Sequence, residues 1–331
     1  MTSAPRARTW HARRGQQGAA LLTAMIVVVM VAALASSMVW QQWKSIEVES
    51  AERARTQSAL ILTGALDWAR LILREDTNNS DNLTEPWAVP LAEARLSTFL
   101  AADRNNTDDG PEAFLSGQIT DEQSKYNLRN LADGDVISPE EQRSFTKLCD
   151  LIGVSQGVAN QLITAIRGSR IGTSDTSESK AASPVYIDSL DQMKWFGLDV
   201  DTIRRLRPYV TLLPGRTPVN VNTASREVIA AAVDNLDVSG AERLVQARQS
   251  NPFTSFAAIG KALDTSIAPS ADRINVTSSY FEVRGRLRLA DRVLEERSIV
   301  SRQGASGRRN VVPISRERIN SIEEAMPGIG Q

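Results

Sequence analysis

The residue types that perform most enzyme chemistry are scarce in this chain of 331 residues. Histidine occurs once, as His11, and cysteine occurs once, as Cys149. A single cysteine excludes an internal disulfide and a cysteine-rich zinc site, and a single histidine near the N-terminus removes most hydrolase mechanisms. We therefore expect a protein that is not an enzyme, with Cys149 as a small core residue. An exported enzyme that uses carboxylates alone is an alternative, because the sequence does not reveal whether two acids pair in a cleft.

Oxygen-bearing side chains at calcium-like spacing occur in the polar stretch DRNNTDD. The stretch lacks the glycine at the sixth place and the glutamate at the twelfth place of an EF-hand loop, so it fails as that motif. We interpret it as a solvated loop and keep Asp103, Asp108 and Asp109 as candidate calcium ligands. Asp175 and Glu178 rank below them, because they lie in a flexible connection rich in Ser and Thr.

One segment, Val219–Ser225, resembles the entry to helix-hairpin-helix domains that bind DNA. The hairpin position, however, contains Asp237, whose carboxylate would repel a phosphate. The whole chain carries 38 Lys and Arg against 39 Asp and Glu, a net charge of -1, which argues against a strongly basic nucleic-acid binder. We interpret Asn222 or Thr223 as a helix cap and Asn220 as a partner for buried backbone. A membrane-anchored helix-hairpin-helix DNA-binding protein of the competence type is the alternative function.

The strongest pattern among the structural elements is an uncharged run, Ala19–Trp40. Its 22 residues would form a helix of about 33 Å, close to the bilayer's hydrocarbon thickness of about 30 Å. Trp40 and Trp43 suit the far interface, and the residues before the run contain no acid and four arginines, namely Arg6, Arg8, Arg13 and Arg14. We expect a single-pass inner-membrane protein with a cytoplasmic N-terminus and a periplasmic C-terminal domain.

Two kinds of processing are compatible with this run. Ala33-Leu34-Ala35 could be the site of an ordinary signal peptidase. The apolar run continues past this site to Trp40, however, and no Pro or Gly interrupts residues 19–63. We therefore expect the run to stay in the mature protein as an anchor.

The junction between the basic segment and the apolar run resembles the class III leader of type IV pilins and pseudopilins. There, RRGQQG is followed at once by AALLTAM. The resemblance implies that a prepilin peptidase removes residues 1–18 by cutting between Gly18 and Ala19, that Ala19 is N-methylated, and that residues 19–40 remain as a transmembrane anchor. Loss of four of the 38 basic residues would leave 34 against 39 acidic residues, a net charge of -5.

The rest of the chain shows helical and strand-like patterns in turn. Residues 51–73 place apolar side chains at helical spacing, which predicts a helix that packs on another element, and the resemblance to pilins implies that this element is an antiparallel sheet. Strand-like segments, the last two of which predict a hairpin, follow at Ala113–Ile119, Lys125–Leu131, Tyr280–Leu289 and Val293–Val300. Between them, residues 138–270 contain three copies of a pattern of helix, turn and helix, with turns around Gly153, Gly197 and Asp237.

Thr23 stands at the fifth position after the expected cut, where most pilins and pseudopilins carry Glu. In that family the carboxylate neutralises the terminal amine of a neighbouring subunit inside an apolar bundle, where an unpaired charge is costly. The missing Glu and the large helical insertion resemble the K family of minor pseudopilins of the type II secretion system, general secretion pathway protein K. The resemblance implies a subunit at the tip of the pseudopilus, with no neighbour above it.

The resemblance also implies a fold. We expect an α+β, type IV pilin-like fold, with a long N-terminal helix plus an antiparallel sheet, and a large inserted SAM-like or helix-hairpin-helix α-domain. The expected parts are the leader 1–18, the anchor 19–40, the pilin helix and first strands 41–137, the α-domain 138–270, the C-terminal strands 271–305 and a tail 306–331.

The resemblance further implies partners and a role. The partners would be the I and J minor pseudopilins, the H pseudopilin, the prepilin peptidase and the inner membrane, with no nucleic acid. The exported domain of such proteins holds structural calcium, for which this sequence gives no certain ligand set. The subunit would cap the pseudopilus with other minor pseudopilins and prime its assembly for export of folded proteins across the outer membrane.

Overall fold

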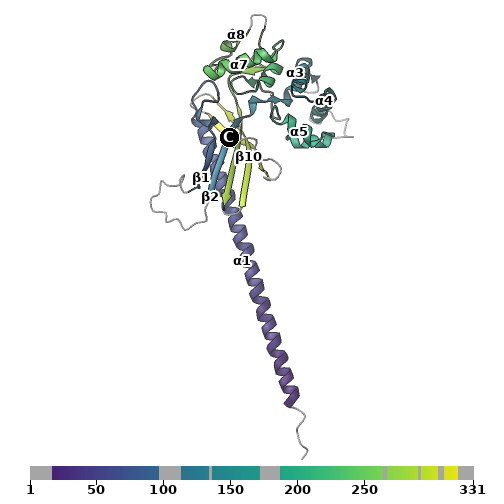
Figure 1. Ribbon diagram of the computed structural model, residues 1–331, viewed down its shortest axis with the longest axis vertical. Coiled ribbons are helices and arrows are strands. Elements are labelled where there is room, and N and C mark those ends of the chain that lie inside the picture. The colour runs from purple at the N-terminus through teal and green to yellow at the C-terminus, as the bar shows by residue number, and fades with distance from the viewer. Residues whose placement is uncertain are drawn as a thin grey trace, which may run out of the picture. The chain divides into compact units, whose positions relative to one another are not determined.

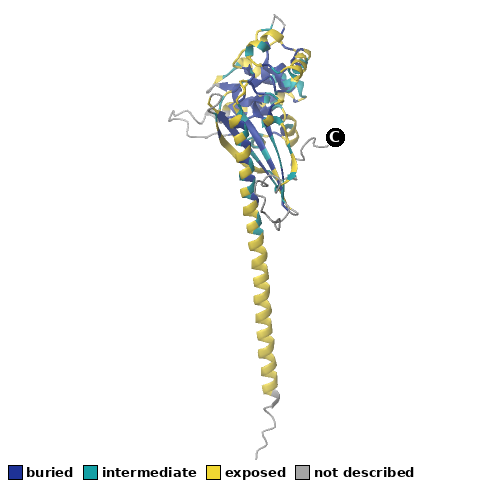
Figure 2. Ribbon diagram, turned by 90° about the vertical axis from the view of Figure 1, so that its left-hand side faces the viewer, coloured by how far each residue is buried: buried dark blue, intermediate teal, exposed yellow. Residues whose placement is uncertain are grey.

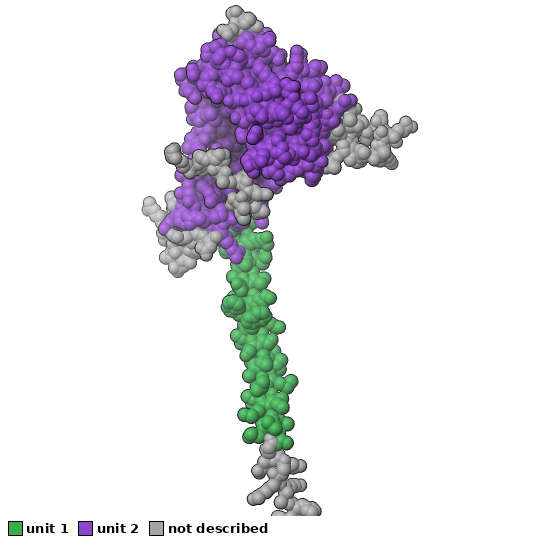
Figure 3. Space-filling model, turned by 45° about the vertical axis from the view of Figure 1, so that its right-hand side comes forward, with its two compact units in different colours: residues 1–60 green, residues 61–331 purple. Residues whose placement is uncertain are grey.

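The structure, a computed structural model, describes residues 17–96, 113–133, 136–171, 187–263, 267–289, 292–304 and 309–319. The chain divides into two compact units, residues 1–60 and residues 61–331 (Figure 3). The described part of the first unit belongs to one long helix, whereas the second unit contains the sheet and the other helices (Figure 1).

The long helix α1 spans Gln17–Glu75, 59 residues in all (Figure 1). It contains no Pro, and no Gly occurs between Gly18 and Gly64, so the sequence offers no break in its main-chain hydrogen bonds. The helix ends at Glu75, and Asp76 is the first residue after it. The carboxylate of Asp76 accepts a hydrogen bond from the Asn78 N–H at 3.0 Å, which gives the backbone an alternative to another helical turn.

Residues 61–75 of α1 pack on a five-stranded antiparallel sheet with the strand order β1-β2-β9-β10-β11. The strands are β1 (Leu91–Arg95), β2 (Ala113–Asp121), β9 (Tyr280–Leu289), β10 (Arg292–Gln303) and β11 (Asn310–Ile319). The predicted hairpin is confirmed as β9 and β10, with Leu289 opposite Arg292. Because β2 pairs with β9, the strands before and after the insertion are neighbours.

The core of this sheet layer confirms the helical stripe predicted for residues 51–73. Four apolar side chains of α1 are buried, namely Leu62, Leu66, Ala69 and Leu73. Three of them share a cluster with side chains of the 3-10 helix η1 (Pro86–Ala88) and of the sheet, namely Trp87, Ile119, Phe281, Val283, Val300 and Val311. Trp87 and Phe281 meet edge to face, with 5.2 Å between ring centroids.

Residues 122–278, called the α-domain below, form a mostly helical insertion between β2 and β9. Its helices are α3 (Pro139–Leu151), α4 (Gln156–Ile171), the 3-10 helix η4 (Leu190–Phe196), α5 (Val200–Leu206), α6 (Arg226–Ala232), α7 (Val238–Ser250) and α8 (Phe256–Ala262). They confirm the three predicted pairs as α3 with α4, η4 with α5 and α6 with α7. The turns contain Gly153 at a φ of 72° and Gly197 at 82°, where glycine meets no Cβ clash. The SAM-like character stays a prediction.

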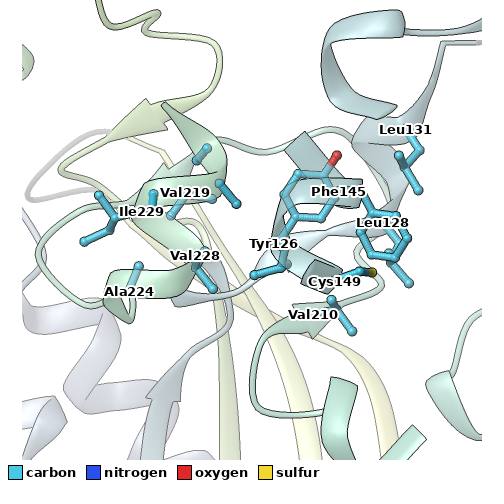
Figure 4. Close-up of a cluster of buried hydrophobic side chains, with 14 of the residues drawn as sticks. Tyr126, Leu128, Leu131, Phe145, Cys149, Val210, Val219, Ala224, Val228 and Ile229 are labelled. Atoms are coloured by element: carbon cyan, nitrogen blue, oxygen red, sulfur yellow. The ribbon is translucent and has the colours of Figure 1, made fainter. Parts of the chain in front are cut away.

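One large cluster of buried side chains holds the α-domain together (Figure 4). In this cluster the ring of Tyr126 stacks on Phe145 with centroids 5.8 Å apart. Cys149 lies in the same cluster without exposed surface, which confirms it as a core residue. Burial raises the pKa of its thiol to about 12, so the group is inert.

The predicted start of the α-domain at residue 138 is wrong. Lys125–Leu131 does not join the main sheet. Instead β3 (Tyr126–Asn127) pairs in parallel with β6 (Val210–Thr211), and the 3-10 helix η3 (Leu128–Leu131) follows. The apolar residues Leu128 and Leu131, three positions apart as on one turn of a 3-10 helix, belong to the α-domain cluster.

Short elements complete the α-domain and correct its end. The 3-10 helix η2 (Glu122–Ser124) opens it, and β4 (Ala132–Asp133) pairs with β5 (Val136–Ile137). The strand β7 (Val219–Asn220) pairs in parallel with β8 (Ile274–Asn275). Since β8 belongs to this domain, the predicted boundary at residue 270 was set too early.

The prediction of a tail over residues 306–331 is wrong in part, because β11 is the fifth strand of the sheet. Val311 is buried, and its carbonyl oxygen accepts from the Arg70 guanidinium at 2.7 and 3.0 Å. Most other β11 side chains are exposed and several are charged, as expected for an edge strand, so the sequence carries little strand signal. Residues 320–331 lie outside the described residues.

Candidate functional site

The first candidate surface is the apolar segment of α1, Ala19–Trp40 (Figure 2). Its large apolar side chains are 58 to 69% exposed. Burying one such side chain fully is worth about 1.5 to 3 kcal/mol, so a run of them is unstable in water. Among the described residues, α1 is the one helix long and apolar enough to cross a membrane. The chain therefore carries a single N-terminal membrane anchor in its described part.

Thr23 lies on this segment and presents no charge. Its Oγ1 donates to the carbonyl oxygens of Ala19 and Ala20, both at 3.0 Å, so the hydroxyl is satisfied within its own helix. The segment Ala19–Trp40 contains no ionisable side chain at all. A neighbouring helix that packs on it meets an apolar face with no carboxylate.

The expected cleavage site lies at the beginning of α1. The helix starts at Gln17, which places Gly18 and Ala19 in its first turn. The basic residues of the expected leader lie outside the described residues. Cleavage between Gly18 and Ala19 and methylation of Ala19 stay predictions.

A group of three carboxylates, Asp76, Asp81 and Glu85, lies just after α1, with ligand atoms within 4.8 Å of one another. Arg302 already binds two of them, with Nη1 to Asp76 at 2.7 Å and Nη2 to Asp81. Arg309 adds a second contact to Asp76 at 2.7 Å. Two guanidinium groups thus fill the positions that a cation would take, and the cluster fits an ion-pair network better than calcium.

Glu85 is the third acid of this group. Its Oε2 accepts from the Trp87 indole at 2.6 Å, and its Oε1 accepts from Asn82 at 2.8 Å. Burial, with added repulsion from Asp76 and Asp81, raises the pKa of Glu85 to about 7. The predicted calcium ligands Asp103, Asp108 and Asp109 lie outside the described residues, as do Asp175 and Glu178, so calcium stays a prediction.

The second candidate site is the junction where the chain enters and leaves the α-domain. Asp121, at the end of β2, accepts four hydrogen bonds there. Its Oδ2 accepts from Asn220 at 3.0 Å, from Thr223 at 2.6 Å and from Ser278 at 2.6 Å, and its Oδ1 accepts from the Gln123 N–H at 2.8 Å. This one carboxylate therefore ties the sheet to β7 and to the segment that leads into β9.

Asn220 and Asp81 continue the same network. Asn220 is fully buried, and its Nδ2 also donates to the Asp81 carbonyl at 3.1 Å. The Asp81 carboxylate accepts from the Ser278 N–H at 2.7 Å, and the Ser278 carbonyl accepts from Arg302 at 2.8 Å. These contacts fix the α-domain on the sheet through hydrogen bonds between buried polar groups of the protein itself.

The four donors to Asp121 are neutral groups, so dipoles stabilise the charge of this carboxylate. Burial raises the pKa of Asp121 to about 6, although the bonds from Ser278 and Thr223 act in the opposite direction. Both Asp121 and Glu85 therefore titrate close to neutral pH, within the same unit of the molecule.

Sequence reasoning missed the junction because its members lie far apart in the chain. Asp121 and Asn220 are separated by 99 positions, and Asp81 and Arg302 by 221. No spacing rule links such residues. The one signal in the sequence was the combination of small polar residues in Val219–Ser225, which the structure explains as a junction and not as a nucleic-acid site.

The structure accounts for the residues of the DNA-binding alternative. Asp237 is the N-cap of α7 and accepts from the Gly240 N–H at 2.7 Å, so its carboxylate occupies the place where a phosphate would bind. The prediction that Asn222 or Thr223 caps a helix is wrong, because Ser225 caps α6. Asn222 instead bonds the Phe253 backbone through both ends of its amide, each at 2.9 Å. Asn220 confirms the predicted role, since its Oδ1 accepts from the Asn222 N–H.

Comparison with known proteins links this architecture to one family. Two family models described as type II secretion system (T2SS), protein K, match residues 124–215 and residues 219–281. Together they cover the α-domain almost completely, including the segment from 124 to 137 that was predicted to belong to the sheet.

Curated relatives with the name type II secretion system protein K are similar over most of the chain. The protein of Pseudomonas aeruginosa is 27% identical over 305 residues, which cover 85% of this chain and 87% of the relative. The protein of Pectobacterium carotovorum is 24% identical, with 88% of this chain and 94% of the relative covered. For the protein of Klebsiella pneumoniae the identity is 26%, with coverage of 87% and 93%.

A solved structure shares the fold. The crystal structure of the GspK-GspI-GspJ complex from the type 2 secretion system of enterotoxigenic Escherichia coli contains a chain that matches with a TM-score of 0.58 at 16% sequence identity. The match covers 82% of this chain and 99% of that chain. On the two family models over the α-domain and the relatives that match over most of its length, the chain is similar to the type II secretion system protein K family.

Proposed function

We propose that this protein is a minor pseudopilin that caps the tip of the type II secretion pseudopilus. The observation that carries the proposal is the apolar segment of α1, whose side chains are all exposed. Such a helix is stable in a bilayer or against other apolar helices, and the same segment can serve both states in turn. Assembly then means transfer of this helix from lipid to a bundle of sister helices. Nothing in this role requires catalysis.

The partners that we propose for this bundle are the I and J minor pseudopilins, with the H pseudopilin below them. The support is the similarity to a chain from the GspK-GspI-GspJ complex and to relatives named protein K. Thr23 supports the position at the tip, because the apolar segment Ala19–Trp40 offers no carboxylate to the amine of a subunit above. The α-domain would add bulk that stops growth in that direction.

We further propose the orientation and the processing. Four arginines before the apolar run favour a cytoplasmic N-terminus, which puts the α-domain in the periplasm. A prepilin peptidase would cut between Gly18 and Ala19 and leave the anchor attached. The resulting complex would prime the pseudopilus for export of folded proteins across the outer membrane.

Site-specific photo-cross-linking in cells tests this function. A benzoylphenylalanine in place of Met30, which is 62% exposed on the apolar segment, is expected to cross-link to the I or J pseudopilin when the full system is present. In cells that lack the prepilin peptidase, the chain should keep residues 1–18 and the cross-link should disappear. A cross-link to lipid alone in the complete system would contradict the proposal.

A further inference from the structure

An apolar groove lies in the second unit between α1, η1 and the sheet. Its volume is about 240 Å³, and its walls include Ala65 and Ala69 of α1, Pro86 of η1, Val89 after it, and Leu91 of β1. The one charged residue in its described lining is Arg284, whose guanidinium is held by Glu282 at 2.6 Å. The groove thus offers almost purely apolar surface.

The rim of the groove is preformed. Val89 stands at the rim with 65% of its surface exposed, although it is a large apolar side chain. Pro86 and Pro90 flank it on both sides and restrict the backbone of this short segment. A rigid apolar pocket costs little ordering when a partner binds, and anchors that fill such pockets carry most of the binding energy in protein interfaces.

The size and chemistry of the groove exclude other occupants. Pockets for small molecules measure about 300 to 1,000 Å³, more than this groove, whose polar lining residues in the described part are Ser116, Gln118 and Arg284. Lipid chains do not reach it either. From Trp43, at the expected interface, to Ala65 the helix rises over 22 residue steps, about 33 Å. The groove suits one or two large apolar side chains of another protein.

We propose that this groove receives a large apolar side chain from the extramembrane helix of a sister pseudopilin. The inference rests on the proposed function, in which sister helices pack along the apolar segment of α1. The groove is built on the continuation of that same helix through Ala65 and Ala69. A neighbour already held by the apolar segment is present at high effective concentration, so even a small pocket adds to the affinity of the pair.

Cross-linking of the full-length chain in membranes tests the groove separately from the anchor. Benzoylphenylalanine replaces one residue at a time: Val89 at the rim, Met30 on the apolar segment, or Val200 on α5. Val200 is the matched control, a valine of the α-domain that is 51% exposed. The expected result is a cross-link to a sister pseudopilin from positions 89 and 30 and none from position 200. Cross-links from position 30 with only intramolecular, lipid or no products from position 89 would overturn the groove and leave the proposed function intact. Loss of the cross-link from position 89 and from position 30 would count against both the groove and the proposed function.

A charge substitution gives a second readout. Val89→Glu would place a carboxylate at the mouth of an apolar pocket, and we expect co-isolation of the sister pseudopilin to fall about tenfold. Val200→Glu is the control and should change co-isolation less than about twofold. Both valines are exposed, so both variants should keep the wild-type melting temperature. Equal co-isolation by the two variants would refute the groove as a docking site.

Discussion

At the scale of the residue, Thr23 is the position that our proposal links to the end of the assembly. Its hydroxyl bonds only carbonyl oxygens of its own helix, those of Ala19 and Ala20. We expect Thr23→Val, which keeps the shape and removes the hydroxyl, to leave co-isolation of sister pseudopilins unchanged within about twofold, a free-energy change below about 0.5 kcal/mol. Quantitative immunoblotting of the isolated complex measures this. A complete loss of co-isolation would mean that the Thr23 hydroxyl contacts a neighbouring subunit. That result would contradict the hydrogen bonds assigned to this hydroxyl within its own helix.

Asp121 is the residue whose titration should be visible in the stability of the molecule. Its pKa rises from 3.8 to about 6 on folding, so the folded state binds the proton more tightly than the unfolded chain. The free energy of unfolding should therefore decrease as the pH rises from about 4 to about 6, by about 3 kcal/mol from this group alone. Below pH 4 the contribution is fully favourable.

Asp121→Asn isolates this contribution, because Glu85 and all other acids stay in place. Urea unfolding of the wild-type chain and the variant at pH 4.5 and pH 6.5 should show a smaller pH dependence for the variant. The variant is also expected to be less stable at the lower pH, since its amide cannot accept from all four donors of the junction. Identical pH dependence in the two proteins would show that Asp121 titrates normally.

At the scale of elements, the ion pairs after α1 connect the end of the helix to β10. Arg302 is 4% exposed, forms ion pairs with Asp76 and Asp81, and donates a hydrogen bond to the Ser278 carbonyl. Removing one partner of a buried pair costs about 3 to 5 kcal/mol, so Arg302→Met should lower the free energy of unfolding by about that amount. Arg204→Met is the matched control. Arg204 pairs with Asp201 while 71% exposed, and its loss should change stability by less than about 1 kcal/mol. Chemical denaturation measures both, and equal losses would remove the role assigned to Arg302.

The elements also show what a sequence can predict. The anchor, the β9 and β10 hairpin and the three helix pairs each follow from periodicity within about 25 residues, and all are present. The strands β1 and β11 were missed, because an edge strand exposes most of its side chains and β1 buries none completely. Lys125–Leu131 was misassigned for a different reason. Tyr126 and Leu128 are two positions apart as in a strand, yet Leu128 and Leu131 fill the core of the α-domain from a 3-10 helix.

At the scale of the whole molecule, the insertion decides which contacts can be foreseen. The α-domain separates β2 from β9 by more than 150 positions, yet Asp121 and Phe281 lie opposite each other in register. The junction network forms only after that pairing brings Asp121 next to Ser278 and Asn220. Its chemistry therefore depends on tertiary structure, whereas the leader and the anchor depend on local sequence alone. For the same reason, the N-terminal sequence reveals the resemblance to pseudopilins. The site between the sheet and the α-domain, in contrast, is visible only in the structure.

The apolar helix is central to the proposed function, in which it stays with the mature protein and serves first as anchor and then as assembly surface. The most direct test is mass spectrometry of the N-terminal peptide of the chain isolated from the assembled complex. We predict a chain that begins at N-methylated Ala19. A chain that begins after Ser37, or one in the complex that still carries residues 1–18, would contradict this role of the helix.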